Sequence, residues 1–258
     1  MPTVKKTKNI FKNFFIYVKK IVFYVIIDLM KFLGVLMKNT KKGLLIFTLI
    51  ASLLSAVIYL ALSAAYALTV SNILYLSGVL PVIIEVFVWL FGLLSYGVIF
   101  SLLIYSVFLF GAKGALPQAL IHCAILLFIK NLANTVIQSW ILGIQTTFPD
   151  LLLPLANALL DIALVFVVIL IAHVKQKKGR KTTDRAAALR PTALFVAIII
   201  SATKLVSRIV YDLGYGAPSD LNDLLNMLIG YTSDLSIIAI IFLVSHLTFK
   251  YLKRGDLK

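Results

Sequence analysis

Residues 151–174 read LLLPLANALLDIALVFVVILIAHV, a run whose only acidic or strongly basic side chain is Asp161. A helix of this length is about 36 Å long, enough to cross the roughly 30 Å hydrocarbon core of a bilayer. The apolar residues of this stretch follow one another without the alternation of apolar and polar residues that barrel strands show, which favours a spanning helix. Five further runs are mostly apolar and long enough to span a bilayer, at Gly43–Val70, Val79–Phe110, Pro117–Gly143, Pro191–Tyr211 and Leu225–Phe249. The sequence therefore predicts an all-α polytopic membrane protein with six spans, in which a domain at 43–250 holds the hairpins 43–110, 117–174 and 191–249.

The composition of the whole chain agrees with this class. Of 258 residues, 61% are apolar and 14% charged, and the mean hydropathy is +1.03. Soluble domains average about 45–50% apolar and 25% charged residues, so a soluble globular enzyme is excluded. A single cysteine, Cys123, excludes an internal disulfide. The metalloprotease, serine-hydrolase, P-loop and dinucleotide-binding motifs are missing, so we expect no cofactor and no metal.

The basic residues predict the orientation in the membrane. Of the 25 Lys and Arg, 22 lie in 1–42, at Lys113, in 175–190 or in 250–258, which a six-span chain places on one side. Basic loops favour the cytoplasm, so we expect a multi-pass protein of the cell membrane with both termini cytoplasmic. The net charge of +15 is thus explained by topology, and no nucleic-acid partner is expected.

The N-terminal segment 1–42 is predicted to lie on the membrane rather than to cross it. Across residues 10–38, lysines cluster on one half of a helical wheel, while aromatic and aliphatic side chains occupy mainly the other half. Such an amphipathic helix suits the plane of the inner leaflet, with anionic lipids as partners. A seventh span at 21–37 is the alternative, but it would place basic segments on the wrong side. Residues 251–258 form a second basic cytoplasmic segment.

Polar residues recur in the second half of the chain and suggest a tandem repeat of two-helix hairpins. Lys130 and Lys204 are 74 residues apart. Asp161 and Asp234 are 73 residues apart, as are His173 and His246. A tandem two-span unit keeps its orientation, so its copies would be related by an axis along the membrane normal. The first hairpin lacks the matching lysine and is not assigned to the repeat.

The predicted site is a polar stripe inside the spans. Lys130, Asn134 and Gln138 recur every four residues, as do Lys204 and Arg208, so each set lies on one helix face. An ionised side chain at mid-span costs about 2.5–3.5 kcal/mol, so these charges must pair or face a wet cavity. We expect Lys130 to contact Asp161 and Lys204 to contact Asp234, within each hairpin, either directly or through one polar neighbour, which leaves Arg208 as the surplus cation. The predicted binding residues are Lys130, Asn134, Gln138, Asp161, Lys204, Arg208 and Asp234.

Two functions fit this stripe. A transporter, channel or lipid translocator would use it as a cavity for an anionic small molecule or an anionic lipid headgroup. A non-catalytic membrane subunit or assembly factor would use the same charges to dock a partner helix, from another chain or a second copy. A membrane enzyme that uses Asp161 and Asp234 as acid and base is a third, less favoured alternative. An inward-facing stripe around a hydrated cavity would favour transport, and an outward-facing stripe would favour docking.

Overall fold

The computed structural model describes residues 41–70, 80–179, 185–215, 218 and 221–251. The chain divides into two units, Met1–Phe47 and Thr48–Lys258, and the predicted site lies in the second. The predicted in-plane helix at 10–38 and the tail after Tyr251 lie outside the described residues. Apart from 142–147 and Pro218, every described residue is helical. The elements are α2 (Lys41–Val70), α3 (Leu80–Ala124), η1 (Ile125–Ala133), α4 (Asn134–Ile141), α5 (Phe148–Gly179), α6 (Arg185–Tyr215) and α7 (Leu221–Tyr251).

Five helical segments in the described part of the chain are long and apolar enough to cross a membrane. They are Leu45–Thr69, Val82–Ile141, Phe148–Lys177, Ala187–Gly214 and Asp223–Lys250. The predicted all-α class, with helices of membrane-spanning length, is therefore confirmed. The helices α5 and α6 extend beyond the predicted spans at both ends, because polar residues that flank an apolar run can still continue its helix.

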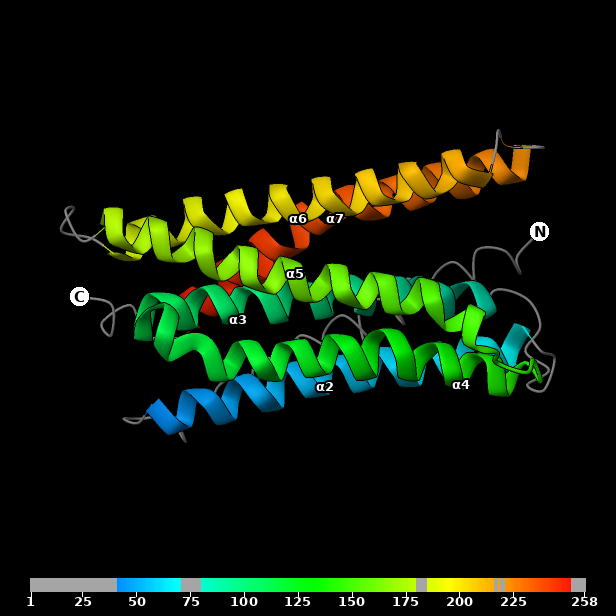
Figure 1. Cartoon of the computed structure of the whole chain (residues 1–258), viewed down its shortest axis with the longest axis horizontal. Helices are drawn as coiled ribbons and strands as arrows, with labels where there is room; N and C mark the ends of the chain where they lie inside the picture. Colours follow the sequence, from blue (N-terminus) through cyan, green and yellow to red (C-terminus); the bar gives the residue numbers. More distant parts are fainter. Residues whose placement is uncertain (1–40, 71–79, 180–184, 216–217, 219–220, 252–258) are drawn as a thin grey trace, which may run out of the picture. The chain divides into compact units, whose positions relative to one another are not determined.

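The second of these segments reverses direction at a glycine. Gly111 has φ 76° and ψ 173°, a conformation that residues with a side chain rarely adopt. The ribbon turns back on itself within α3 (Figure 1), which brings η1 beside the first half of α3. The side chain of Lys130 accordingly reaches the carbonyl of Gly92, although 38 residues separate them.

The core of the unit surrounds the first half of α3. The ten consecutive residues 99–108 are all buried, and α3 contacts α5, α6, α7 and η1. A helix that is apolar on every face is stable only when other helices enclose it. The two serines in this stretch fit because Ser101 and Ser106 donate to carbonyls of their own helix, Gly97 and Leu102.

A π-helix separates α3 from α4. In η1 the backbone hydrogen bonds run from residue i to i+5, so each turn holds more residues than an α-helical turn. Neighbouring side chains therefore point in directions that an α-helical wheel does not predict. Lys130 and Asn131 both lie in this segment, and Lys130 faces α3 whereas Asn131 faces α5.

Candidate functional site: a charged cavity between the helices

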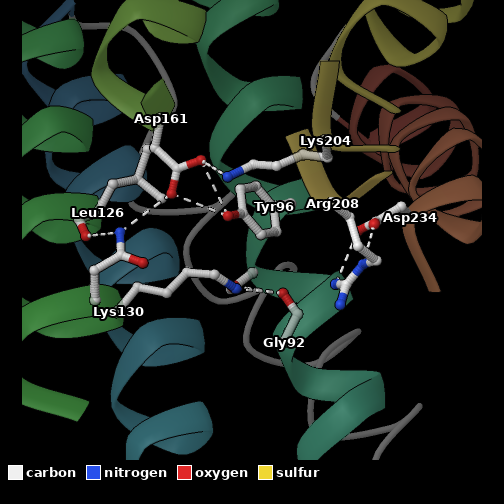
Figure 2. A network of polar contacts seen from close by, with 10 residues as sticks. Gly92, Tyr96, Leu126, Lys130, Asp161, Lys204, Arg208 and Asp234 are labelled. Carbon is white, nitrogen blue, oxygen red and sulfur yellow. Dashed lines mark hydrogen bonds and ion pairs between the residues drawn. The ribbon is translucent and has the colours of Figure 1, made fainter. Parts of the chain in front are cut away.

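Four of the seven predicted residues line one cavity. Lys130 of η1, Lys204 and Arg208 of α6, and Asp234 of α7 lie on the wall of a cavity of about 490 Å³. Asp161 of α5 lies behind this wall and is fully buried. Figure 2 shows the five charged side chains directed toward one another from four elements. The remaining lining residues are Tyr59, Val88, Trp89, Gly92, Leu93, Tyr96, Asn131, Leu153, Asn157, Ser207, Tyr211, Ser233 and Ile237.

Asn134 and Gln138 lie on α4, outside the lining of the cavity. The amide of Asn134 is 3.5 Å from the hydroxyl of Tyr59, and the amide of Gln138 is 3.5 Å from the Asn134 oxygen. Both distances are at the long limit for a hydrogen bond. The structure therefore places these two residues on the α2-facing side of α4, apart from the charged group.

Asp161 forms the central ion pair. Its Oδ1 lies 2.5 Å from Nζ of Lys204, whose side chain comes from the next hairpin. The hydroxyl of Tyr96 donates to both carboxylate oxygens, at 3.1 and 3.0 Å, and the Asn131 amide donates to Oδ2 at 3.1 Å. The carboxylate thus has partners on α3, η1 and α6, which offsets the cost of burying it.

Asp234 forms the second ion pair, with Arg208. Nε of Arg208 lies 2.5 Å from Oδ2, and Nη2 lies 3.4 Å from Oδ1. This two-point geometry matches the planar guanidinium to the carboxylate. The side chain of Arg208 is nevertheless 42% exposed, whereas that of Asp234 is 9% exposed. Arg208 therefore keeps part of its surface toward the cavity.

Lys130 has no carboxylate within ion-pair distance among the residues that the structure describes. Its Nζ donates to the carbonyl oxygen of Gly92 at 2.8 Å and to Oγ of Ser95 at 2.9 Å. The ammonium also lies 4.0 Å from the ring centre of Tyr96 and 4.6 Å from that of Tyr59. Dipoles and aromatic faces stabilise a cation without cancelling its charge.

The predicted contact between Lys204 and Asp234 was wrong, whereas Lys130 reaches Asp161 through one polar neighbour, as predicted. Lys204 pairs with Asp161 rather than with Asp234, and Asp234 pairs with Arg208. Lys130 reaches Asp161 only through Tyr96, whose ring faces the ammonium and whose hydroxyl binds the carboxylate. The cation without a carboxylate is consequently Lys130 and not Arg208. The equivalent acids of the suggested repeat have non-equivalent partners, and the repeat stays a prediction.

Three residues of the site were missed from the sequence. Tyr96 and Tyr59 are aromatic residues in apolar spans, where nothing in the pattern separates a site residue from a packing residue. Asn131 had a usable signal, because it is a polar side chain next to Lys130 at mid-span. It was passed over because an α-helical wheel places it off the stripe of Lys130, Asn134 and Gln138.

Comparison of the chain with protein-family models, with curated proteins and with solved structures finds no match. The chemistry of the cavity must therefore be derived from its own residues. No group of three His, Cys, Asp or Glu side chains suited to a metal ion occurs in the described part of the chain. The cavity does contain unused donors. An arginine has five N–H donors, and two of those of Arg208 bind Asp234. A lysine has three, and two of those of Lys130 bind Gly92 and Ser95.

Proposed function

We propose that this protein is a membrane transporter or lipid translocator that binds a singly charged oxyanion in the cavity. A phosphodiester headgroup and a small soluble phosphate or carboxylate share this chemistry. The observation that supports the proposal is the charge of the site. Among the described residues, Lys130 on the cavity wall has no carboxylate at ion-pair distance, whereas Lys204 pairs with Asp161, and Arg208 pairs with Asp234 and also interacts with Asp212.

The direction of the charges favours binding over docking of a partner helix. Lys130, Lys204 and Asp234 are turned into the protein, and Arg208 lies on the cavity wall. An internal network of ion pairs needs no adjoining cavity, because its stability depends on close geometry and on hydrogen bonds to the remaining donors and acceptors. A partner helix that docks in the membrane would need such charges on the lipid-facing side instead.

The proposal includes six crossings with both termini in the cytoplasm of the cell. The segment Val82–Ile141 has 60 residues, and the reversal at Gly111 divides it into two arms of spanning length. With six crossings the basic loops fall on one side, where the segment 1–42 can bind anionic inner-leaflet lipids. In this orientation the cavity lies in the outer half of the membrane domain, because its lining residues flank the outer loops.

The experiment is reconstitution into vesicles with two arms. One arm follows uptake of radiolabelled inorganic phosphate, and the other follows the loss of dithionite protection of a fluorescent phosphatidylglycerol. Activity in the first arm identifies a soluble anion, and activity in the second identifies a lipid. Lys130→Met should abolish the activity that the wild type shows. Lys113→Met is the matched control, because Lys113 is exposed and outside the cavity lining.

Two results would contradict the proposed function. One is a folded wild-type protein that is inactive in both arms across a panel of anionic lipids. The other is wild-type activity in Lys130→Met. Recovery of a stoichiometric membrane partner from the wild type, and its loss from Lys130→Met, would instead establish the docking alternative.

A further inference from the structure

One half of the α6–α7 hairpin is not packed into the protein. Along α6, buried residues recur at Leu189, Thr192, Ala193, Val196, Ala197, Ile200 and Ser201. Between residues 202 and 233, none of the described residues is buried. We call the described residues 202–215 and 221–233 the α6–α7 arm. Segments with few buried side chains have low local stability and are the ones that move.

The arm forms a wall of the cavity. Lys204, Ser207, Arg208 and Tyr211 line the cavity at helical spacing. Val206, Ile209, Val210 and Leu213 form the neighbouring stripe on α6, and each is exposed. One stripe is polar and meets the cavity, and the other is apolar and suits lipid. The α6 half of the arm therefore separates the two environments.

The opposite wall is a connected unit, which we call the frame. It consists of α3, η1 and α5 around the cavity. Lys130 joins η1 to α3 through Gly92 and Ser95. Asn131 joins η1 to α5, and Tyr96 joins α3 to α5, both through Asp161. These bonds hold the frame together without any residue of the arm.

Polar contacts between the described residues of the arm and the frame include the Lys204–Asp161 ion pair, the Lys204 ammonium 5.4 Å from the ring centre of Tyr96, and a hydrogen bond from Nε1 of Trp89 to Oγ of Ser233, at 2.8 Å. The packed part of the hairpin begins where Ser201 donates to the backbone oxygen of Asp234, at 2.6 Å. This buried bond ties α6 to α7 at the base of the arm. A bending point there would leave the packed half of both helices in place.

We propose that the α6–α7 arm is the gate of the cavity, that it bends at Ser201 and Asp234, and that the Lys204–Asp161 ion pair holds it against the frame. The role of an anion in this motion rests on the proposed function. An oxyanion in the cavity competes with Asp161 for the Lys204 ammonium. Asp161 would remain hydrogen-bonded to Tyr96 and Asn131, because both belong to the frame. Releasing the arm therefore leaves no buried carboxylate without a donor.

The test measures spin-label distances by pulsed electron paramagnetic resonance, with the full chain in lipid nanodiscs and Cys123→Ser as background. One pair, Leu152 on α5 with Leu213 on α6, reports on the arm. The matched pair, Leu170 with Leu194 on the same two helices, reports on the packed half. All four side chains are exposed, so labels should not disturb packing. Lys204→Met removes the ion pair and leaves the frame bonds of Asp161 intact.

We expect Lys204→Met to shift the 152–213 distances to longer, broader distributions and to leave the 170–194 distances unchanged. Asp161→Asn is the second variant and should give the same result. Unchanged 152–213 distances in both variants would overturn the gate. Equal shifts at both pairs would overturn it too, because the whole hairpin would then move.

Adding inorganic phosphate to one wild-type sample, and phosphatidylglycerol to another, separates this inference from the proposed function. A shift with either probe that resembles that of Lys204→Met supports both. A shift in the variants without a response to either probe supports the gate and counts against the anion-binding function.

Discussion

Asp161 determines how the charges of the site are divided. It accepts hydrogen bonds from Tyr96 and Asn131 and is fully buried, so a single cation completes its set of partners. Lys204 supplies that cation, and Lys130 is left with the Gly92 carbonyl, Ser95 and two aromatic rings. Which of the two lysines pairs with Asp161 therefore decides where in the cavity the unpaired ammonium lies.

The first prediction concerns this pairing. Asp161→Asn leaves the Lys204 ammonium without a carboxylate and should destabilise the protein by about 3–5 kcal/mol, whereas Asp161→Asn with Lys204→Met should cost much less. Equilibrium unfolding in mixed detergent micelles gives the coupling energy from the double-mutant cycle. The matched cycle of Asp161 with Lys130 should be closer to additive. Stronger coupling to Lys130 than to Lys204 would show that the assigned pairing is wrong.

A second prediction uses Gly230, which lies against Arg208. A Cβ at this glycine would lie 2.9 Å from Nη1 and 3.0 Å from Cδ of Arg208. The guanidinium is the end of a flexible side chain and can move aside, but this draws it away from Asp234. Gly230→Ala should therefore weaken phosphate binding, measured by calorimetry in nanodiscs, and should also lower the melting temperature, because the buried Asp234 loses its partner. Gly214→Ala is the control, because nothing lies within 4 Å of its Cβ. Equal phosphate affinity in both variants would show that Arg208 does not bind the anion.

At this scale the sequence predicts where charge occurs but not how it is paired. A lysine or aspartate inside an apolar run is conspicuous, and Lys130, Asp161, Lys204, Arg208 and Asp234 do lie together. Their partners depend on helix rotation and on side chains such as the Tyr96 hydroxyl, which the sequence does not distinguish from packing. Arg208→Gln is consequently a poor test of anion binding, because it also deprives Asp234 of its partner.

At the scale of elements, η1 explains why Lys130 does not contact Asp161 directly. Helical spacing from Lys130 to Asn134 and Gln138 assumes a uniform α-helix, but Lys130 lies in the π-helical Ile125–Ala133. Within this segment Asn131 faces Asp161, while Lys130 faces Gly92 on α3. Extra residues in a helical turn leave no mark in an apolar pattern, so the sequence could not reveal the change of direction.

The third prediction belongs to the reversal between the two arms of α3. Gly111 has open space around its Cβ position, so a side chain there meets no clash and is opposed by the positive φ alone. Gly111→Ala should cost about 1–3 kcal/mol of stability, the usual penalty for such a backbone conformation. Thermal unfolding compared with Gly214→Ala measures it. Equal melting temperatures would mean that the reversal does not depend on the glycine.

At the scale of the whole molecule, membrane class and helix positions follow from hydropathy, because a chain that crosses a bilayer as helices needs each of them to be long and apolar. The number of crossings depends on one turn inside a 60-residue helical segment, and the sequence marks it by Gly111, Lys113, Gly114 and Pro117 between two apolar runs. The orientation depends on basic loops, which act during insertion and leave no trace in packing.

The fourth prediction is the topology. In a Cys123→Ser background, single cysteines at residue 216 should react with an impermeant reagent added outside intact cells, and those at residue 180 should react only after permeabilisation. Protease added to sealed, right-side-out vesicles should also leave residue 5 uncut if the segment 1–42 lies on the cytoplasmic surface. The reverse labelling pattern would show that the protein has the opposite orientation in the membrane. Cleavage at residue 5 would establish a seventh span.

The central claim is that the cavity binds a singly charged oxyanion beside Lys130 and Arg208. Perrhenate is a tetrahedral monoanion with strong anomalous scattering, so it can be located without ambiguity in crystals grown from a lipid phase. We predict an anomalous peak inside the cavity in the wild type, within hydrogen-bond distance of Nη1 of Arg208, and its loss in Lys130→Met crystals of the same form. An empty wild-type cavity in crystals that hold perrhenate elsewhere, or an undiminished peak in Lys130→Met, would contradict the claim.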